Sequence, residues 1–205
     1  MKFTQIPNDT FQKLQLNAGI LVKSFAPSTG TITDIIGATS GGVSFTATPS
    51  FSDFGEDIDN APKNTKELKK LDSWEVSMTG SFVTVDSASA KMLVGAGDTS
   101  TVASSEVTKI TPRNDVADAD FSDIWWVGDY SDVNDDTNGG FIAIHMLNSL
   151  STGGFSLQTS DRSKGTFAFT FTGHYSINSQ DTVPFEVYVK AGESEPQGAT
   201  GATGV

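Results

Sequence analysis

The chain has no cysteine and little positive charge, and these two absences exclude several classes of protein. Without cysteine there are no disulfide scaffolds, cysteine-ligated zinc sites, thiol nucleophiles or thiol redox motifs. Lys and Arg number 13 against 25 Asp and Glu in 205 residues, so the formal net charge is −12. A surface of that sign is repelled by nucleic-acid phosphates. The sequence therefore disfavours conventional DNA- and RNA-binding proteins, which bind phosphates through a basic surface patch.

Long apolar runs are missing as well. No run approaches the roughly 20 residues of a membrane-spanning helix. Pro7, Asn8 and Asp9 stand where a signal peptide has its apolar segment. We therefore expect a soluble protein that is made in a cytoplasm, and the length fits one ordinary domain with an added tail.

Hydroxyl side chains and phenylalanine dominate what is present. Ser and Thr together number 48 and Phe 14, and these residues suit a pleated, half-buried strand better than a helix. One short helix is predicted at about 86–95, with Asp86 or Ser87 as its cap and Gly95 at its end. The predicted fold is mainly β, a β-sandwich or half-barrel with one short flanking helix, a long inter-strand loop and an N-terminal arm.

The chain divides into three parts by this pattern. They are an N-terminal arm at 1–19, a β domain at 20–190 with a loop at 49–72 inserted, and a flexible Gly/Ala/Thr tail at 191–205. The tail repeats Gly at period three as collagen does, but its repeat holds no Pro. Loops beyond about 12–15 residues are usually functional or disordered. Phe51 and Phe54 indicate that this loop docks, either on a neighbouring subunit or back on its own domain.

Two strands show the clearest alternation. In 74–85 and 166–172 large apolar residues occupy one face and small residues the other. The small residues are Ser77, Thr79, Ser81, Ala168, Thr170 and Thr172. They are too small and polar for a second core, so they predict either the lining of a wet channel or an ordinary solvent-facing sheet.

Catalytic chemistry is poorly represented. The phosphate-binding loop, G-x-S-x-G and H-E-x-x-H are absent, and His145 and His174 lie in or beside strands, where a structural role is the usual one. The Asp-rich stretch at 115–136 is typical of a solvated face. Within it, the segment Asp132–Gly140 fails the EF-hand pattern, which leaves a looser calcium site or a plain Asn-Gly turn. We predict no catalytic, cofactor-binding or metal-binding residues, and no enzymatic activity.

Three stretches resemble a known family. They are DSWEVSMTGSFVTVDSASAKMLVGAGD, then DIWWVGDYSD with GGFIAIHMLNSLSTGGFSLQTSDRSKGTFAFTFTGHYS, and the closing QDTVPFEVYVK. Together they span roughly residues 72–190. In their order and local sequence they resemble the major tail (tail tube) proteins of long-tailed bacteriophages.

The resemblance implies a structural virion protein that is assembled in the host cytoplasm. In that family six subunits form a ring whose sheets join into one β-barrel, and the rings stack into a tube. The partners implied are further copies of the chain, the tape-measure protein, tail terminator and tip proteins, and double-stranded DNA that crosses the lumen without specific binding. Neither a membrane nor a cofactor is implied. The resemblance also implies that Phe51 and Phe54 lie in an assembly loop and that the six small residues lie on the lumen face.

Two other interpretations of the residues remain. The first is a carbohydrate-binding or adhesin-like β-sandwich, with Trp125, Trp126 and Tyr130 as a sugar platform. The second is a hydrolase that uses a pair of carboxylates. The platform requires exposed rings. The hydrolase requires two carboxylates whose environments separate their pKa values.

Overall fold

The structure, a computed structural model, describes residues 6–7, 10, 14–15, 17–129 and 139–190. The described strands are β1 (Ile20–Ala26), β2 (Thr31–Gly37), β3 (Thr39–Asp53), β4 (Lys69–Phe82), β5 (Gly97–Thr101), β6 (Thr108–Pro112), β7 (Ser122–Asp129), β8 (Phe141–Ser151), β9 (Ser156–Gln158), β10 (Thr166–Gly173) and β11 (Phe185–Lys190). The helical elements are α1 (Ser87–Val94) and the short 3-10 turns η2 (Lys66–Leu68) and η3 (Asp118–Asp120).

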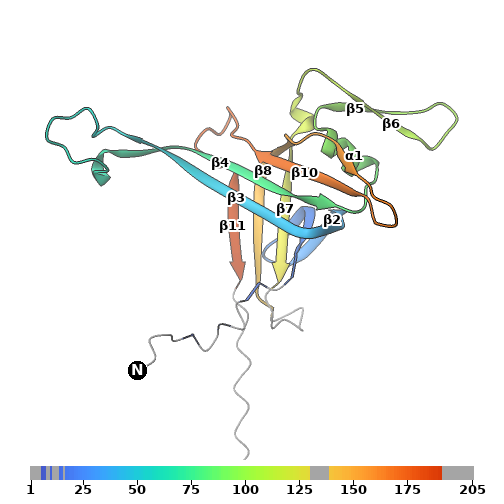
Figure 1. Ribbon diagram of the computed structural model, residues 1–205, viewed down its shortest axis with the longest axis horizontal. Coiled ribbons are helices and arrows are strands. Elements are labelled where there is room, and N and C mark those ends of the chain that lie inside the picture. The colour runs from blue at the N-terminus through green and yellow to red at the C-terminus, as the bar shows by residue number, and fades with distance from the viewer. Residues whose placement is uncertain (1–5, 8–9, 11–13, 16, 130–138, 191–205) are drawn as a thin grey trace, which may run out of the picture.

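One bent antiparallel sheet forms both layers of the domain. Its strand order is β2-β1-β7-β8-β10-β4-β3, with β11 paired to β8 and β9 paired to β10. In Figure 1 the strands β7, β8 and β11 run across the direction of β3, β4 and β10. A sheet that bends over itself in this way encloses its core between the two halves. The predicted sandwich or half-barrel with one flanking helix is confirmed.

The bend lies in β8, which belongs to both layers. Most of this strand pairs with β7 and β11, whereas Leu150 and Ser151 pair with β10. Asn148 stands between the two regions with a φ of 46°, a left-handed conformation that Asn tolerates better than most residues. Its backbone N–H donates to Asp123 Oδ1 at 3.0 Å, and its side-chain amide donates to the His174 carbonyl at 3.2 Å. These bonds hold the kink that lets β8 change layers.

The core fills the space between the layers. Phe82, Phe171, Met78 and Met146 are fully buried there, and Leu93 of α1 closes one end. The apolar face predicted for 74–85 and the Phe face predicted for 166–172 both point into this core. The inward direction of these faces leaves the small residues of the same strands on the outside.

The helix follows the sequence prediction closely. Asp86 accepts from the backbone N–H of Ser89 at 2.7 Å, and Ser89 Oγ accepts from the N–H of Asp86 at 2.9 Å, which completes a capping box. Gly95 ends the helix at a φ of 78°. A Cβ at Gly95 would lie 2.9 Å from the Ser151 carbonyl oxygen, so both conformation and space require glycine.

The two ends of the predicted loop at 49–72 belong to the strands of a β-hairpin, which corrects the boundaries of the loop. β3 continues to Asp53 and β4 begins at Lys69, so the connection itself covers only 54–68. Pro49 and the run of lysines hid the strand pattern. Pro49 is compatible with β3 because a strand at the edge of a sheet has N–H groups that need no partner. We call residues 49–72 the hairpin arm, and Figure 1 shows it projecting far beyond the rest of the domain.

A buried carboxylate in η3 pairs with a lysine of α1 and with the arginine that follows β6. The side chain of Asp120 is 1% exposed and pairs with Arg113 and, at 3.6 Å, with Lys91. The backbone N–H of Ala117 donates to it at 2.9 Å. Burial alone would raise the pKa of Asp120, but the Ala117 N–H lowers it most, Arg113 and Lys91 add to this, and the net pKa lies below the ordinary value.

The lowered pKa of Asp120 predicts an acid-sensitive contribution to stability. The ionised form is favoured in the folded state, so the contribution is complete above the ordinary Asp pKa of about 3.9 and is lost as pH falls through the lower folded value. The melting temperature of Asp120→Asn is therefore expected to lie below that of the native chain at pH 7 and to approach it towards pH 3. Asp118→Asn, at an exposed carboxyl of the same turn, is the control. A gap that stayed constant from pH 7 to pH 3 would show that the carboxylate charge is not what matters.

Candidate functional site

The six small residues predicted to share a surface do lie on one face of a strand pair. The register of β4 with β10 places Ser81 opposite Ala168, Thr79 opposite Thr170, and Ser77 opposite Thr172. The core side chains of the same strands point the other way. The six residues therefore form one continuous surface on the outside of the layer.

Strand β3 widens this surface with residues that the sequence analysis did not select. Ser44 pairs with Thr79, Thr46 with Ser77, and Thr48 with Glu75. The alternation of Ser44, Thr46 and Thr48 with Val43, Phe45 and Ala47 was the signal for this face. We call the ten residues together the polar face: Ser44, Thr46, Thr48, Glu75, Ser77, Thr79, Ser81, Ala168, Thr170 and Thr172.

The polar face is almost uncharged. Glu75 is its one ionisable residue, although the chain as a whole carries −12. The hydroxyl groups of Thr172 and Thr152 bond to each other at 2.8 Å across the end of the face. This surface offers short hydrogen-bonding groups to water and presents neither cations nor apolar rings.

The layer that carries the polar face has an open edge. Within the described residues β3 pairs with β4 alone, and it is 15 residues long. At the other side of β10, β9 has only three residues and β8 pairs through two. Unpaired edges attract further strands unless something blocks or covers them. This layer is thus open to extension by strands from another chain.

The hairpin arm presents exposed apolar side chains. Phe51 is 51% exposed and Phe54 is 59% exposed, and Ile58 and Leu71 are exposed beside them. The arm therefore does not fold back on its own domain to bury these rings. Exposed apolar clusters on a projecting element are typical of surfaces that bind another protein.

The tip of the arm is held in shape by polar contacts. Asp53 accepts from the backbone N–H groups of Gly55 and Asn64, each at 2.9 Å; the Gly55 bond and then the Asn64 bond lower the pKa of its carboxyl. Lys69 Nζ donates to Asn64 Oδ1 at 3.2 Å and lies 5.2 Å from the centre of the Phe51 ring. The arm therefore offers its apolar groups in a defined arrangement.

Trp125, one of the three aromatic residues proposed as a sugar platform, is buried, and Trp126 is half-buried. Trp125 is 7% exposed, and its ring stacks on His145 with centroids 3.9 Å apart and planes 8° apart. Trp126 packs against the core and donates from Nε1 to the Ala18 carbonyl at 3.0 Å. Tyr130 lies outside the described residues. The platform interpretation therefore lacks the exposed Trp125 ring that it requires.

His145 belongs to a network that ties three strands together. Its Nε2 lies 3.3 Å from Asp123 on β7, and its Nδ1 lies 3.5 Å from Glu186 on β11. Tyr188 donates to Glu186 at 2.5 Å; this bond, followed by the contact with His145, lowers the pKa of Glu186, and the same bond raises the pKa of Tyr188. His145 thus bridges carboxylates and faces no Ser or Thr hydroxyl in these contacts, which fits the structural role expected for it.

The described part of the chain contains neither a cluster of metal ligands nor a membrane-spanning helix. No group of three or more potential ligands there could hold a metal ion, and no helix there is long and apolar enough to cross a membrane. The segment Asp132–Gly140, left above as a loose calcium site or a turn, lies outside the described residues apart from Gly139 and Gly140.

Comparisons with known proteins give structural likenesses that are weak. No family model and no curated protein matches the chain. A chain from the tail of an empty GTA particle with C6 symmetry resembles it with a TM-score of 0.41 and 8% identity, covering 78% of this chain and 92% of that one. A chain from the virion of a native gene transfer agent (GTA) particle does so with a TM-score of 0.40 and 7% identity, at the same coverage. Likenesses of this degree carry no argument about function.

Proposed function

We propose that the protein is a structural subunit of a phage tail tube, which assembles into hexameric rings that stack around the tape-measure protein and later conduct DNA. The observation that carries the proposal is the polar face. Its ten residues lie on three paired strands, carry one ionisable group, and cover the outside of a layer whose edge strand β3 is open on one side. The sequence resemblance to tail tube proteins supports it independently. The proposal assigns no catalytic role to any residue.

Ring formation follows from the open edges. When β3 of one copy aligns beside the β9–β8 edge of the next, backbone N–H and C=O groups that faced water pair with each other, and closure of the ring leaves no open edge in this layer. The polar faces of all copies then line a common lumen. Six subunits per ring come from the resemblance.

The lining of such a lumen suits passage of DNA. Phosphates bind proteins chiefly by displacing counterions with Lys and Arg, and the polar face has neither. Its hydroxyl groups stay hydrated, and the one carboxylate, Glu75, repels phosphate. DNA would therefore slide along this wall without being held by it.

Thr79→Cys provides a direct test of the lumen assignment, because the native chain has no cysteine to interfere. In assembled protein Thr79→Cys is expected to react with a small maleimide and to resist a maleimide attached to a long polymer, because a bulky reagent enters a narrow tube slowly. Glu106→Cys, at an exposed site between β5 and β6, should react with both reagents. Equal reaction of Thr79→Cys with both reagents in assembled protein would place the polar face on the outside and contradict the proposal.

A further inference from the structure

The open edge of β3 can be oriented from one hydrogen bond. The backbone N–H of Trp74 on β4 donates at 2.8 Å to the hydroxyl of Tyr175, which follows β10, so this N–H points away from β3. In an antiparallel pair, opposite residues either both turn their N–H and C=O groups towards each other or both turn them away. Pro49 lies opposite Trp74, so its backbone nitrogen and carbonyl face the open edge.

Alternation identifies the groups that β3 offers to another strand. The register with β4 is unbroken from Val43 to Pro49. Val43, Phe45 and Ala47 therefore also turn their N–H and C=O groups outward. Pro49 has no N–H to donate at this edge.

A bulge and the proline limit this stretch, residues 43–47, which we call the pairing window. Between Thr39 and Val43, β3 has three residues where β4 has one. Within that bulge Gly41 and Gly42 have φ angles of 82° and 83°. Bulges twist an edge away from a further strand. The edge of β3 is therefore open to pairing over one short window.

Strand β9, on the other side of the layer, matches this window. Leu157 lies opposite Phe167 on β10, whose backbone groups face β4 by the same alternation, so the N–H and C=O of Leu157 point outward. The Leu157 side chain is 52% exposed and lies on the core side of the layer, as that of Phe45 does. Ser156 and Gln158 alternate with it and lie on the side of the polar face. With β9 of one copy beside β3 of the next, both the core and the polar face would continue across the joint.

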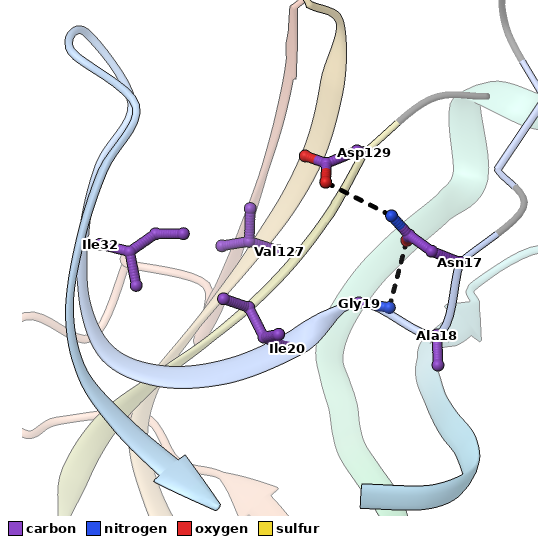
Figure 2. A pocket seen from close by; sticks show the side chains of 7 residues that line it. All are labelled: Asn17, Ala18, Gly19, Ile20, Ile32, Val127 and Asp129. Carbon is purple, nitrogen blue, oxygen red and sulfur yellow. Dashed lines mark hydrogen bonds between the residues drawn. The ribbon is translucent and has the colours of Figure 1, made fainter. Parts of the chain in front are cut away.

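Strand β2, an edge strand of the other layer, is protected against such pairing. Asp34 interrupts it with a φ of 56°, and the β1–β2 hairpin curls over its layer. Ile32 pairs with Phe25, five residues beyond Ile20, yet Ile32 and Ile20 line the same small pocket together with Val127 (Figure 2). Edge strands that twist away in this manner do not readily accept a further strand.

Barrel geometry selects one of three registers between β9 and the window. Within a copy Leu157 lies in the row of Phe82. The window residues Val43, Phe45 and Ala47 lie two, four and six residues further along β4, and pairing Leu157 with one of them staggers neighbouring copies by that number. Over the four strands β9, β10, β4 and β3 of each copy, at about 3.4 Å per residue and about 4.8 Å between strands, the strands then tilt by about 20°, about 35° or about 47°. Closed barrels typically tilt by roughly 35–45°, which selects Phe45.

The limits of the window favour the same register. With Leu157 opposite Phe45, β9 is centred on the window, and the residues that flank Leu157 on either side meet the two outer donors. A shift of two residues in either direction places one of those flanking residues opposite Pro49 or the bulge, where a hydrogen bond is lost.

We propose that the joint between ring neighbours pairs Leu157 of one copy with Phe45 of the next, and that Pro49 and the bulge at Gly41 and Gly42 fix this register. The inference rests on the proposed function, since it requires that copies close into a ring. It adds to that function the stagger between neighbours and the residues that prevent the strands from slipping.

Cysteine cross-linking between singly substituted chains measures the register. Ser156→Cys chains are mixed in turn with Ser44→Cys, Thr46→Cys and Thr48→Cys chains, allowed to assemble and treated with a mild oxidant. All four positions are exposed, and each chain has a single cysteine, so every disulfide joins two copies. In the proposed register Ser156 lies opposite Thr46 with Cα atoms about 4.5 Å apart, a spacing that a disulfide can bridge. Ser44 and Thr48 each lie two residues further along the strand. A size tag on one partner distinguishes mixed dimers from pairs of identical chains.

The outcomes separate this inference from the function on which it rests. A mixed dimer with Thr46→Cys, several-fold more abundant than with Ser44→Cys or Thr48→Cys, supports the register. A predominant dimer with either of the other two chains, or full-size assembly without any mixed dimer and with unmodified thiols, overturns the register and leaves the tube proposal standing. Native chains that melt cooperatively but stay monomeric overturn both.

A second variant tests the role of Pro49. Adding Pro49→Thr to the Thr48→Cys chain restores an N–H at the edge and removes one limit of the window. The yield of its mixed dimer with Ser156→Cys is expected to rise. A yield that did not change would show that Pro49 does not fix the register.

Discussion

Phe54→Asp is expected to stop assembly while the subunit stays folded. The side chain is more than half exposed, so its loss should change the free energy of unfolding by no more than about 0.5 kcal/mol. In the assembly the same position would bury an unpaired carboxylate at a contact centre, where truncation alone typically costs 2 kcal/mol or more, as a rough guide. The loss is repeated at every copy, so the sedimentation profile should change from large particles to subunits or isolated rings, with an unchanged thermal melt.

Val107→Asp is the matched control for this substitution. Val107 is 59% exposed, as Phe54 is, and it lies on a different projecting hairpin. It should assemble as the native chain does. If Phe54→Asp lost its cooperative melt as well, the arm would belong to the folding core; if it still assembled fully, the arm would not be an assembly element.

Gly80→Ala is expected to destabilise the subunit itself. Gly80 lies on the core face of β4, opposite Phe169 on β10, and a Cβ there would lie 2.6 Å from the tip of the Phe169 ring and 3.1 Å from the Gly42 carbonyl oxygen. Phe169 has little freedom to move away, because it is 2% exposed and packs between the rings of Phe82 and Phe171. Overpacking of this kind typically costs about 1–3 kcal/mol, which for a chain of this size lowers the melting temperature by roughly 2–12 °C.

Gly165→Ala is the control for that prediction. A Cβ at Gly165 would meet its neighbours at 3.5 Å, an ordinary contact, and its φ is not left-handed. Its melting temperature should stay near that of the native chain. Equal melting temperatures for the Gly80→Ala and native chains would show that the Phe169 ring can yield and that the glycine is not required by packing.

The strands of the core could be predicted from sequence because their signal is local. Phe167, Phe169 and Phe171 alternate with small residues over a full strand, and β10 follows that alternation. The helix carries both of its end signals, Asp86 and Gly95, within a few residues. Where one face is buried and the other is open, the alternation of apolar and polar residues predicts both the strand and the face that points inward.

Features that depend on distant partners were not predictable in the same way. β9 has three residues, and β5 consists of a glycine and four polar residues, so each is defined by its partner strand more than by its own pattern. The sequence-based prediction that Trp125 and Trp126 are both exposed is wrong for Trp125, because His145 from β8 covers its ring. The kink at Asn148, which sends β8 into both layers, depends on the hydrogen bonds that Asn148 donates to Asp123 and to His174, both more than 20 residues away.

The position of the charge changes the meaning of the acidic composition. The net charge of −12 predicts a surface that is repelled by nucleic-acid phosphates. On the polar face the structure places one carboxylate among hydroxyl and methyl groups. The proposed passage of DNA therefore depends on the absence of cations from that face more than on the total charge of the chain.

Negative-stain electron microscopy of the purified protein across a range of concentration and salt tests the central claim most directly. The account predicts rings with a central hole, six-fold in end view, and stacks of such rings as concentration rises. A population that stays monomeric under all conditions, while it melts cooperatively, would contradict the account.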